Sequence, residues 1–156
     1  MSGPLEAPSD GRQSEAALAI CRGVRRLLRA HGFATVTELP PTSGRRADVV
    51  GVNGDGALVI VELKSSVADF RADRKWRDYF AHCDRLYFAV DADMPLAIMP
   101  EVAGLIVADS YGGEILREPA ARAIPPAARR AVLLRFAFAA ADRLHRLADP
   151  GAPPET

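Results

Sequence analysis

Two charged residues interrupt an apolar segment, VIVELKSS, at residues 59–66. Side chains alternate between the two faces of a β-strand, so Glu62 and Lys64 are predicted to lie on the same face. A strand buried on both faces has little reason to carry a carboxylate and an ammonium group unless they are used. A solvated strand face or a simple ion pair is the common alternative for such a tripeptide considered alone.

A third ionisable residue, Asp48, lies in the preceding apolar segment, and a short loop, NGDG, joins the two segments into a predicted antiparallel hairpin. A three-residue loop places Asp48 directly opposite Glu62, whereas a two-residue loop leaves the two carboxylates diagonal. Like charges at this distance repel each other unless a cation compensates them. Oxygen ligands of this kind favour Mg²⁺, with Mn²⁺ as an alternative.

These groups together predict metal-assisted hydrolysis of a phosphodiester bond. Asp48 and Glu62 are the predicted metal ligands, and the backbone carbonyl of Leu63 supplies a further oxygen. Lys64 is the third predicted catalytic residue, because its ammonium group can orient or help deprotonate the attacking water and offset charge on the phosphate.

The remaining sequence predicts the elements that position these residues. Ser14 caps a first helix that ends near His31, and three strands follow over residues 33–39, 45–53 and 57–64. Ser66, with Asp69 three residues later, resembles a capping box and opens a second helix that is predicted to continue to about residue 82. Its candidate buried positions are Phe70, Trp76, Tyr79, Phe80 and Cys83.

The second half of the sequence predicts a strand over residues 85–90, a hairpin over 104–118 and a last helix that starts at Pro125-Pro126. The predicted fold class is therefore α/β, with a mixed central sheet flanked by helices and the order αβββαβ followed by a hairpin and a helix. In the last helix, apolar residues recur at helical spacing at Ala131, Leu134, Phe138, Ala141 and Leu144 or His145.

The bulk composition predicts one cytoplasmic domain. The 156 residues carry 20 basic and 20 acidic side chains, so no global positive field indicates a nucleic-acid partner, although a local patch can still bind phosphates. Two cysteines are too few for a disulfide framework. Neither a secretory leader nor a membrane span is predicted. Residues 1–13 and 149–156 are expected to be disordered tails around a domain at 14–148.

The spacing of Asp48 and Glu62-Leu63-Lys64 on this order of elements resembles the PD-(D/E)xK, or restriction-endonuclease-like, superfamily, with Ala47 where the motif has Pro. The longer segments RRADVVGV, VELKSSVADFRADRKWRDYFAHCDRLYFAV and GLIVADSYGGEILREP resemble the bacterial MmcB family of DNA-repair proteins, over about residues 14–147.

This resemblance implies a restriction-endonuclease-like three-layer fold and a nuclease of the DNA-damage response, with DNA and other repair proteins as partners and no membrane. A catalytically silent DNA-binding or adaptor module of the same fold is the alternative. The resemblance also implies an upstream acid in the metal site, for which Glu38 is the first candidate and Glu15 the second.

Five polar residues near the acids are predicted to contact DNA: Lys75, Arg46, Arg71, Ser65 and Ser66. Arg71 and Lys75 are expected to share a helix face, and pairing with nearby aspartates is the alternative for the basic residues of this segment. Arg46 is equally compatible with protection of a strand edge. The arginines of the first helix are interpreted as a solvated face, with DNA contact as the alternative. Trp76 and Tyr79 are interpreted as core residues rather than base-stacking ones.

Overall fold

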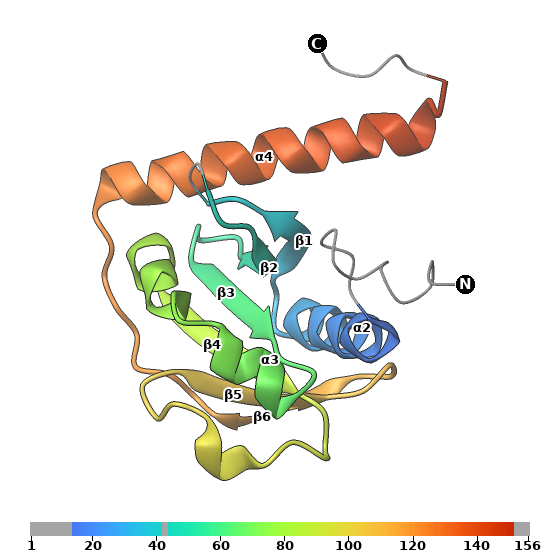
Figure 1. Ribbon diagram of the computed structural model, residues 1–156. Coiled ribbons are helices and arrows are strands. Elements are labelled where there is room, and N and C mark those ends of the chain that lie inside the picture. The colour runs from blue at the N-terminus through green and yellow to red at the C-terminus, as the bar shows by residue number, and fades with distance from the viewer. Residues whose placement is uncertain (1–13, 42–43, 152–156) are drawn as a thin grey trace.

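A six-stranded sheet forms the centre of the structure, a computed structural model that describes residues 14–41 and 44–151 (Figure 1). The strands lie in chain order from β1 to β6. The β3–β4 and β4–β5 pairs are parallel and the other three pairs are antiparallel, so the sheet is mixed, as the sequence predicts. The strands are β1 (Ala34–Leu39), β2 (Ala47–Val52), β3 (Leu58–Leu63), β4 (Arg85–Val90), β5 (Gly104–Ala108) and β6 (Gly113–Arg117).

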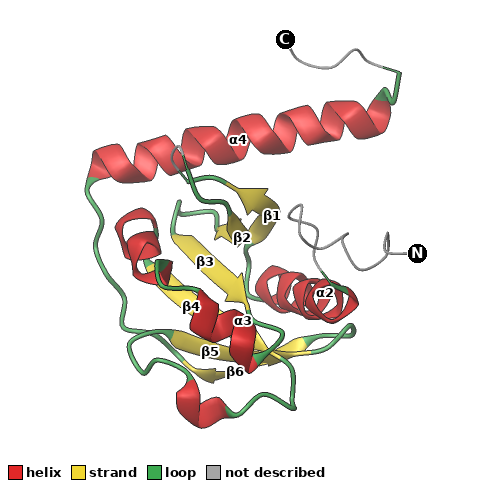
Figure 2. Ribbon diagram, in the orientation of Figure 1, coloured by secondary structure: helices red, strands yellow, loops and turns green. Residues whose placement is uncertain are grey.

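Helices cover both faces of this sheet, which confirms the predicted α/β fold class (Figure 2). On one face, α2 (Glu15–Ala30) packs its apolar side against inward side chains of β2 to β5. On the other face, α3 (Val67–Ala72), the 3₁₀ helix η2 (Trp76–His82) and α4 (Pro126–Ala148) cover a second apolar cluster. A short 3₁₀ turn, η3 (Leu96–Ile98), lies between β4 and β5.

The first helix begins where the sequence predicts, because the Ser14 hydroxyl accepts a hydrogen bond of 3.2 Å from the backbone N–H of Ala17. The position of α2 against the sheet depends on Gly23. A Cβ atom at this position would lie 2.0 Å from the backbone oxygen of Asp109 and 2.4 Å from that of Gly112, in the turn between β5 and β6. Only glycine therefore permits this backbone-to-backbone contact.

The predicted continuous helix over residues 66–82 is wrong. Ser66 does cap a helix, accepting a hydrogen bond of 3.0 Å from the Asp69 N–H, but α3 ends at Ala72. Asp73 then adopts an extended conformation, with φ −85° and ψ 105°. Its carboxylate accepts three hydrogen bonds there, from two basic side chains and from the Lys75 N–H, and these offset the loss of helical continuity.

The last helix does not pack against the rest of the protein with the face that the spacing of its apolar residues predicts. Val132 is buried, and Leu133, Phe136, Ala139 and Ala140 pack against the core, whereas Leu134, Phe138 and Leu144 are exposed. Two arginines anchor this inward side. Arg129 pairs with Asp84 at 2.7 Å, and Arg143 donates a hydrogen bond of 2.6 Å to the Thr37 carbonyl.

Most of the two predicted tails falls outside the described residues. The predicted tail at residues 1–13, and residues 152–156 of the C-terminal one, belong to that part of the chain. Among the helices that the structure describes, none is both long and apolar enough to cross a membrane.

Candidate active site

The hairpin of β2 and β3 has the register that a three-residue loop requires. Val49 pairs with Val61 and Val52 with Leu58, and the Asn53 N–H donates a hydrogen bond of 3.2 Å to the Ala57 carbonyl. Continuing this ladder by one residue places Asp48 opposite Glu62. The first of the two predicted loop lengths is therefore confirmed.

The two carboxylates are tied to each other's strands by hydrogen bonds from the backbone. The Asp48 N–H donates to Glu62 Oε2 at 2.9 Å, and the Leu63 N–H donates to Asp48 Oδ2 at 2.8 Å. Among the described residues, none donates a hydrogen bond to the second oxygen of either carboxylate. Each acid is thus held in place by one oxygen while the other stays available to a ligand.

Burial and mutual repulsion disfavour the charged forms of both acids. Glu62 is only 3% exposed. Burial raises the pKa of Glu62 to about 8, with the neighbouring charge of Asp48 as the second cause. Burial also raises the pKa of Asp48 to about 6, against the lowering effect of the hydrogen bond from Leu63 and the charge of Lys64. The site therefore favours a bound cation that would compensate two carboxylates at neutral pH.

Lys64 has a buried acidic partner. Its ammonium donates a hydrogen bond of 2.8 Å to Asp73 Oδ2, and both side chains are only 7% exposed. Arg45 Nη2 donates to the other oxygen of Asp73 at 3.1 Å. These contacts, together with the Lys75 N–H, lower the pKa of Asp73 despite the opposing effect of burial. Asp73 thereby holds the Lys64 ammonium in one position beside the two acids.

An open cavity of about 730 Å³ lies over this cluster, and we call it the site cavity. It brings together most of the residues that the sequence selects. Predicted catalytic and DNA-contact residues that line it are Asp48, Glu62, Leu63, Lys64, Ser65, Arg46 and Lys75. Arg45, Asp69, Asp73 and Arg74 line it as well.

Four predicted residues lie outside the site cavity: Glu38, Glu15, Arg71 and Ser66. Glu38 has a positive φ of 51°, lines a neighbouring cavity and forms an ion pair of 3.3 Å with Arg46. The expectation that Arg71 and Lys75 share a helix face is wrong, because α3 ends between them. The roles proposed for these residues in metal and DNA binding stay predictions.

Two members of the cluster, Arg45 and Asp73, were not predicted from the sequence. The predicted continuous helix over residues 66–82 would keep Asp73 away from Lys64. The only sequence signal for a role of Asp73 is the high density of charged residues at 69–78. Arg45 also lies over the Tyr79 ring at 5.2 Å and has one buried nitrogen, Nη1, without a hydrogen-bond partner among the described residues. The interpretation of Trp76 and Tyr79 as core residues is confirmed, since both are buried.

The donor set fits a hard divalent cation. Asp48, Glu62 and the Leu63 carbonyl offer only oxygen atoms, which Mg²⁺ prefers, and the open cavity leaves room for water ligands. No cluster of three or more His, Cys, Asp or Glu side chains suited to a metal occurs in the part of the chain that the structure describes. A cation would therefore be held by two carboxylates and the backbone rather than by a cage of side chains.

The mixed sheet, its helices on both faces and the buried acid pair define an α/β protein with a candidate hydrolytic site. The family model for MmcB-like DNA repair proteins matches residues 5–151 of the chain. The chain therefore belongs to this family. The match confirms the resemblance drawn from the sequence motifs.

Two solved structures resemble the chain to different extents. The SPO1766 protein of unknown function from Silicibacter pomeroyi is 41% identical, with 92% of this chain and 98% of that chain covered and a TM-score of 0.87. A repair endonuclease from Pyrococcus abyssi is 20% identical, with 54% of this chain and 40% of that chain covered and a TM-score of 0.36, a similarity too slight to support a conclusion. No curated protein matches the chain.

Proposed function

We propose that this DNA-repair family member is a metal-dependent deoxyribonuclease that hydrolyses phosphodiester bonds at the site cavity. The burial of Glu62 and Lys64 beside Asp48 is the observation that carries the proposal. Burying ionisable groups costs several kcal/mol in general, so a fold retains them where they contribute to binding or chemistry. Membership of the MmcB-like family supports DNA as the substrate class.

The residues of the chain have separate tasks in this proposal. Asp48, Glu62 and the Leu63 carbonyl would hold Mg²⁺ or Mn²⁺. Glu38 would join them as a ligand only by leaving its ion pair with Arg46 beside the site cavity. When bound, the cation would polarise the phosphate and lower the pKa of a water molecule. Lys64 lines the same cavity, and its ammonium group would stabilise the negative charge that builds on the phosphate when water attacks.

Asp73 and Arg45 act as positioning residues. Asp73 fixes the Lys64 ammonium through the 2.8 Å hydrogen bond, and Arg45 holds the second oxygen of Asp73. Arg45 Nη1 is itself buried and has no hydrogen-bond partner among the described residues. Arg46 and Lys75, which line the same cavity, are the side chains proposed to contact neighbouring phosphates.

The experiment that tests this proposal compares the pure protein with Asp48→Asn, Glu62→Gln and Lys64→Met on labelled single-stranded, duplex and branched DNA. Each substrate is incubated with Mg²⁺, Mn²⁺ or EDTA. We expect metal-dependent cleavage that falls at least about 100-fold in each variant, since each loses charge at the reacting phosphate. Asp142→Asn, in α4 and outside the site cavity, is the matched control and should cleave as the unmodified protein does.

Two outcomes would contradict the proposal. Cleavage that persists in Asp48→Asn would place the activity elsewhere or in a contaminant. DNA binding without cleavage in either metal would favour the alternative, a silent DNA-binding or adaptor module. The ion pair of Lys64 with Asp73 is the observation that favours this alternative, because it satisfies the Lys64 ammonium within the chain.

A further inference from the structure

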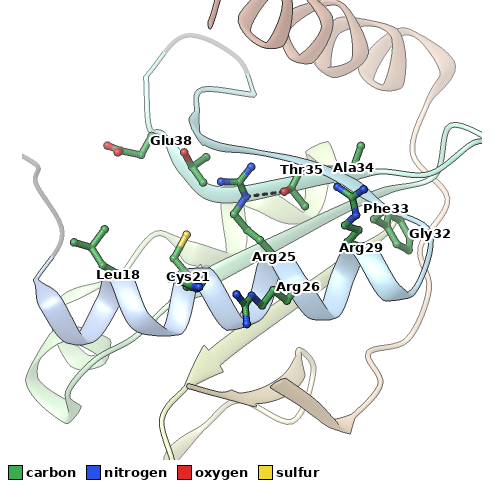
Figure 3. A pocket seen from close by; sticks show the side chains of 12 residues that line it. Leu18, Cys21, Arg25, Arg26, Arg29, Gly32, Phe33, Ala34, Thr35 and Glu38 are labelled. Carbon is green, nitrogen blue, oxygen red and sulfur yellow. Dashed lines mark hydrogen bonds between the residues drawn. The ribbon is translucent and has the colours of Figure 1, made fainter. Parts of the chain in front are cut away.

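A second open cavity, of about 960 Å³, lies between α2 and β1, and we call it the α2 groove. Figure 3 shows Arg25 and Arg29 extending from α2 beside β1, with Leu18 and Glu38 at one end of the groove and Gly32 and Phe33 at the other. Four arginines line it: Arg22, Arg25, Arg26 and Arg29. From the sequence alone, these arginines are interpreted as a solvated face, with DNA contact as the less favoured alternative.

The four arginines form one continuous basic stripe. Their spacing of three, four and seven residues places them on one side of a helix, over about 10 Å of its length. Like charges at these spacings repel each other and destabilise a helix. The stripe therefore has an electrostatic cost that a bound anion would offset.

This stripe differs from other arginines of the chain in its partners. Arg45, Arg46, Arg85 and Arg129 each form an ion pair with a carboxylate. Within the described residues, no carboxylate oxygen lies within 4.0 Å of the stripe.

The hydrogen bonds that the stripe does make leave its charge unbalanced. Arg25 donates to the Thr35 hydroxyl at 2.9 Å and Arg26 to the Tyr111 carbonyl at 3.2 Å, both of which are neutral acceptors. Arg22 and Arg29 have no hydrogen-bond partner among the described residues. All four guanidinium groups therefore keep an uncompensated positive charge beside the groove.

The α2 groove adjoins the site cavity along the same helix. Ser14 and Ala17, in the first part of α2 and its cap, line the site cavity, whereas the lining of the groove begins at Leu18. The two cavities also meet at the ion pair of Glu38 and Arg46, since Glu38 lines the groove and Arg46 lines the site cavity. A chain molecule can therefore lie across both.

We propose that the α2 groove binds the sugar–phosphate backbone of the DNA strand whose scissile phosphate lies in the site cavity. This inference rests on the proposed function for its choice of ligand. A stripe about 10 Å long is long enough for its guanidinium groups to contact adjacent phosphates of one strand. Leu18 and Phe33 supply apolar surface for sugars or bases at the two ends of the groove.

The test measures binding of fluorescent single-stranded and duplex oligonucleotides by anisotropy in EDTA, over a series of salt concentrations. Arg22→Gln/Arg29→Gln is compared with Arg130→Gln/Arg135→Gln, which removes the same charge from exposed positions of α4 outside both cavities. We expect the first variant to bind about tenfold or more weakly at low salt. Its slope of log affinity against log salt should fall by about 1.4 to 1.8, and the control should keep the slope of the unmodified protein.

A charge-retaining variant separates the role of charge from damage to the helix. Arg22→Lys/Arg29→Lys should bind nearly as the unmodified protein does, because a phosphate accepts either cation. An unchanged salt slope in Arg22→Gln/Arg29→Gln, or the same loss in the α4 control, would overturn the inference. So would failure of the unmodified protein to bind DNA.

The outcome for the groove is distinguishable from the outcome for the nuclease. All binding is measured without metal, so cleavage does not enter the result. Binding that depends on Arg22 and Arg29, in a protein that cuts no DNA, would support the groove and contradict the proposed catalysis.

Discussion

Strand β3 and helix α4 depart from the usual distribution of polarity in opposite directions. Every residue of β3 is buried, including Glu62. In the 23-residue α4 only Val132 is buried, while Phe138 is 69% exposed and Leu147 81% exposed. One element hides charge and the other exposes apolar surface.

These departures have different energetic costs, and the difference shows where to look for function. An ionised carboxylate loses its hydration when it is buried, at a cost of several kcal/mol that some interaction must offset. An exposed leucine is equally exposed in the unfolded chain, so it forgoes stabilisation without adding a cost. The charges of β3 therefore require an explanation within the site, and the apolar stripe of α4 requires none for the chain to fold.

The largest predicted effect concerns the ion pair that follows β3. Asp73→Asn leaves Lys64 buried without its acidic partner and should lower the free energy of unfolding by about 2–4 kcal/mol. The corresponding change in α4, Asp142→Asn, removes a partly exposed pair with Arg146 and should cost less than about 0.5 kcal/mol. Urea unfolding at pH 7 measures both, and equal losses would remove the contrast between the two regions.

The next effect is a contrast within α4 itself. Val132→Ala opens a cavity against the core and should cost about 2 kcal/mol, whereas Phe138→Ala removes a larger but exposed side chain and should cost less than about 0.5 kcal/mol. Thermal unfolding under dilute conditions gives the comparison. A greater loss from Phe138→Ala would show that its surface is covered in solution.

A third effect has the opposite sign. Because the pKa of Glu62 is raised in the folded protein, the folded state binds a proton that the unfolded state releases, so stability falls as pH rises from about 4.5 to 8. Glu62→Gln should remove this loss and gain about 1 kcal/mol or more at pH 8. Melting temperatures between pH 5 and 8 test the sign, and adding Mg²⁺ should recover the unmodified protein but not the variant. A variant that is less stable than the unmodified protein at pH 8 would show that the Glu62 carboxylate is not destabilising there.

The sequence predicts the acid pair well because the pair depends on local rules. The loop after Asn53 determines the hairpin register, and the register determines that Asp48 faces Glu62. Capping by Ser14 and Ser66 is local in the same way, and both helix starts are confirmed. The order of strands and helices along the chain follows from the length and polarity of short apolar runs.

Features that depend on distant contacts were not predictable from the same rules. The end of α3 has neither Gly nor Pro to mark it, and Asp73 leaves the helix because Lys64 and Arg45 bind its carboxylate. In α4 both the inward side, with Val132 and Phe136, and the outward side, with Leu134 and Phe138, are apolar at helical spacing. Periodicity alone cannot choose between two such sides, because the choice is made by what the helix packs against.

The contact at Gly23 has a consequence for both cavities. Main chain touches main chain there, so no rotamer change can absorb an added methyl group. Any widening at that point would shift α2 as a rigid body, and with it the wall shared by the acid pair and the arginines. The width of the site cavity and of the α2 groove is thus determined by the turn between β5 and β6. This turn lies at the opposite edge of the sheet and carries none of the proposed chemistry.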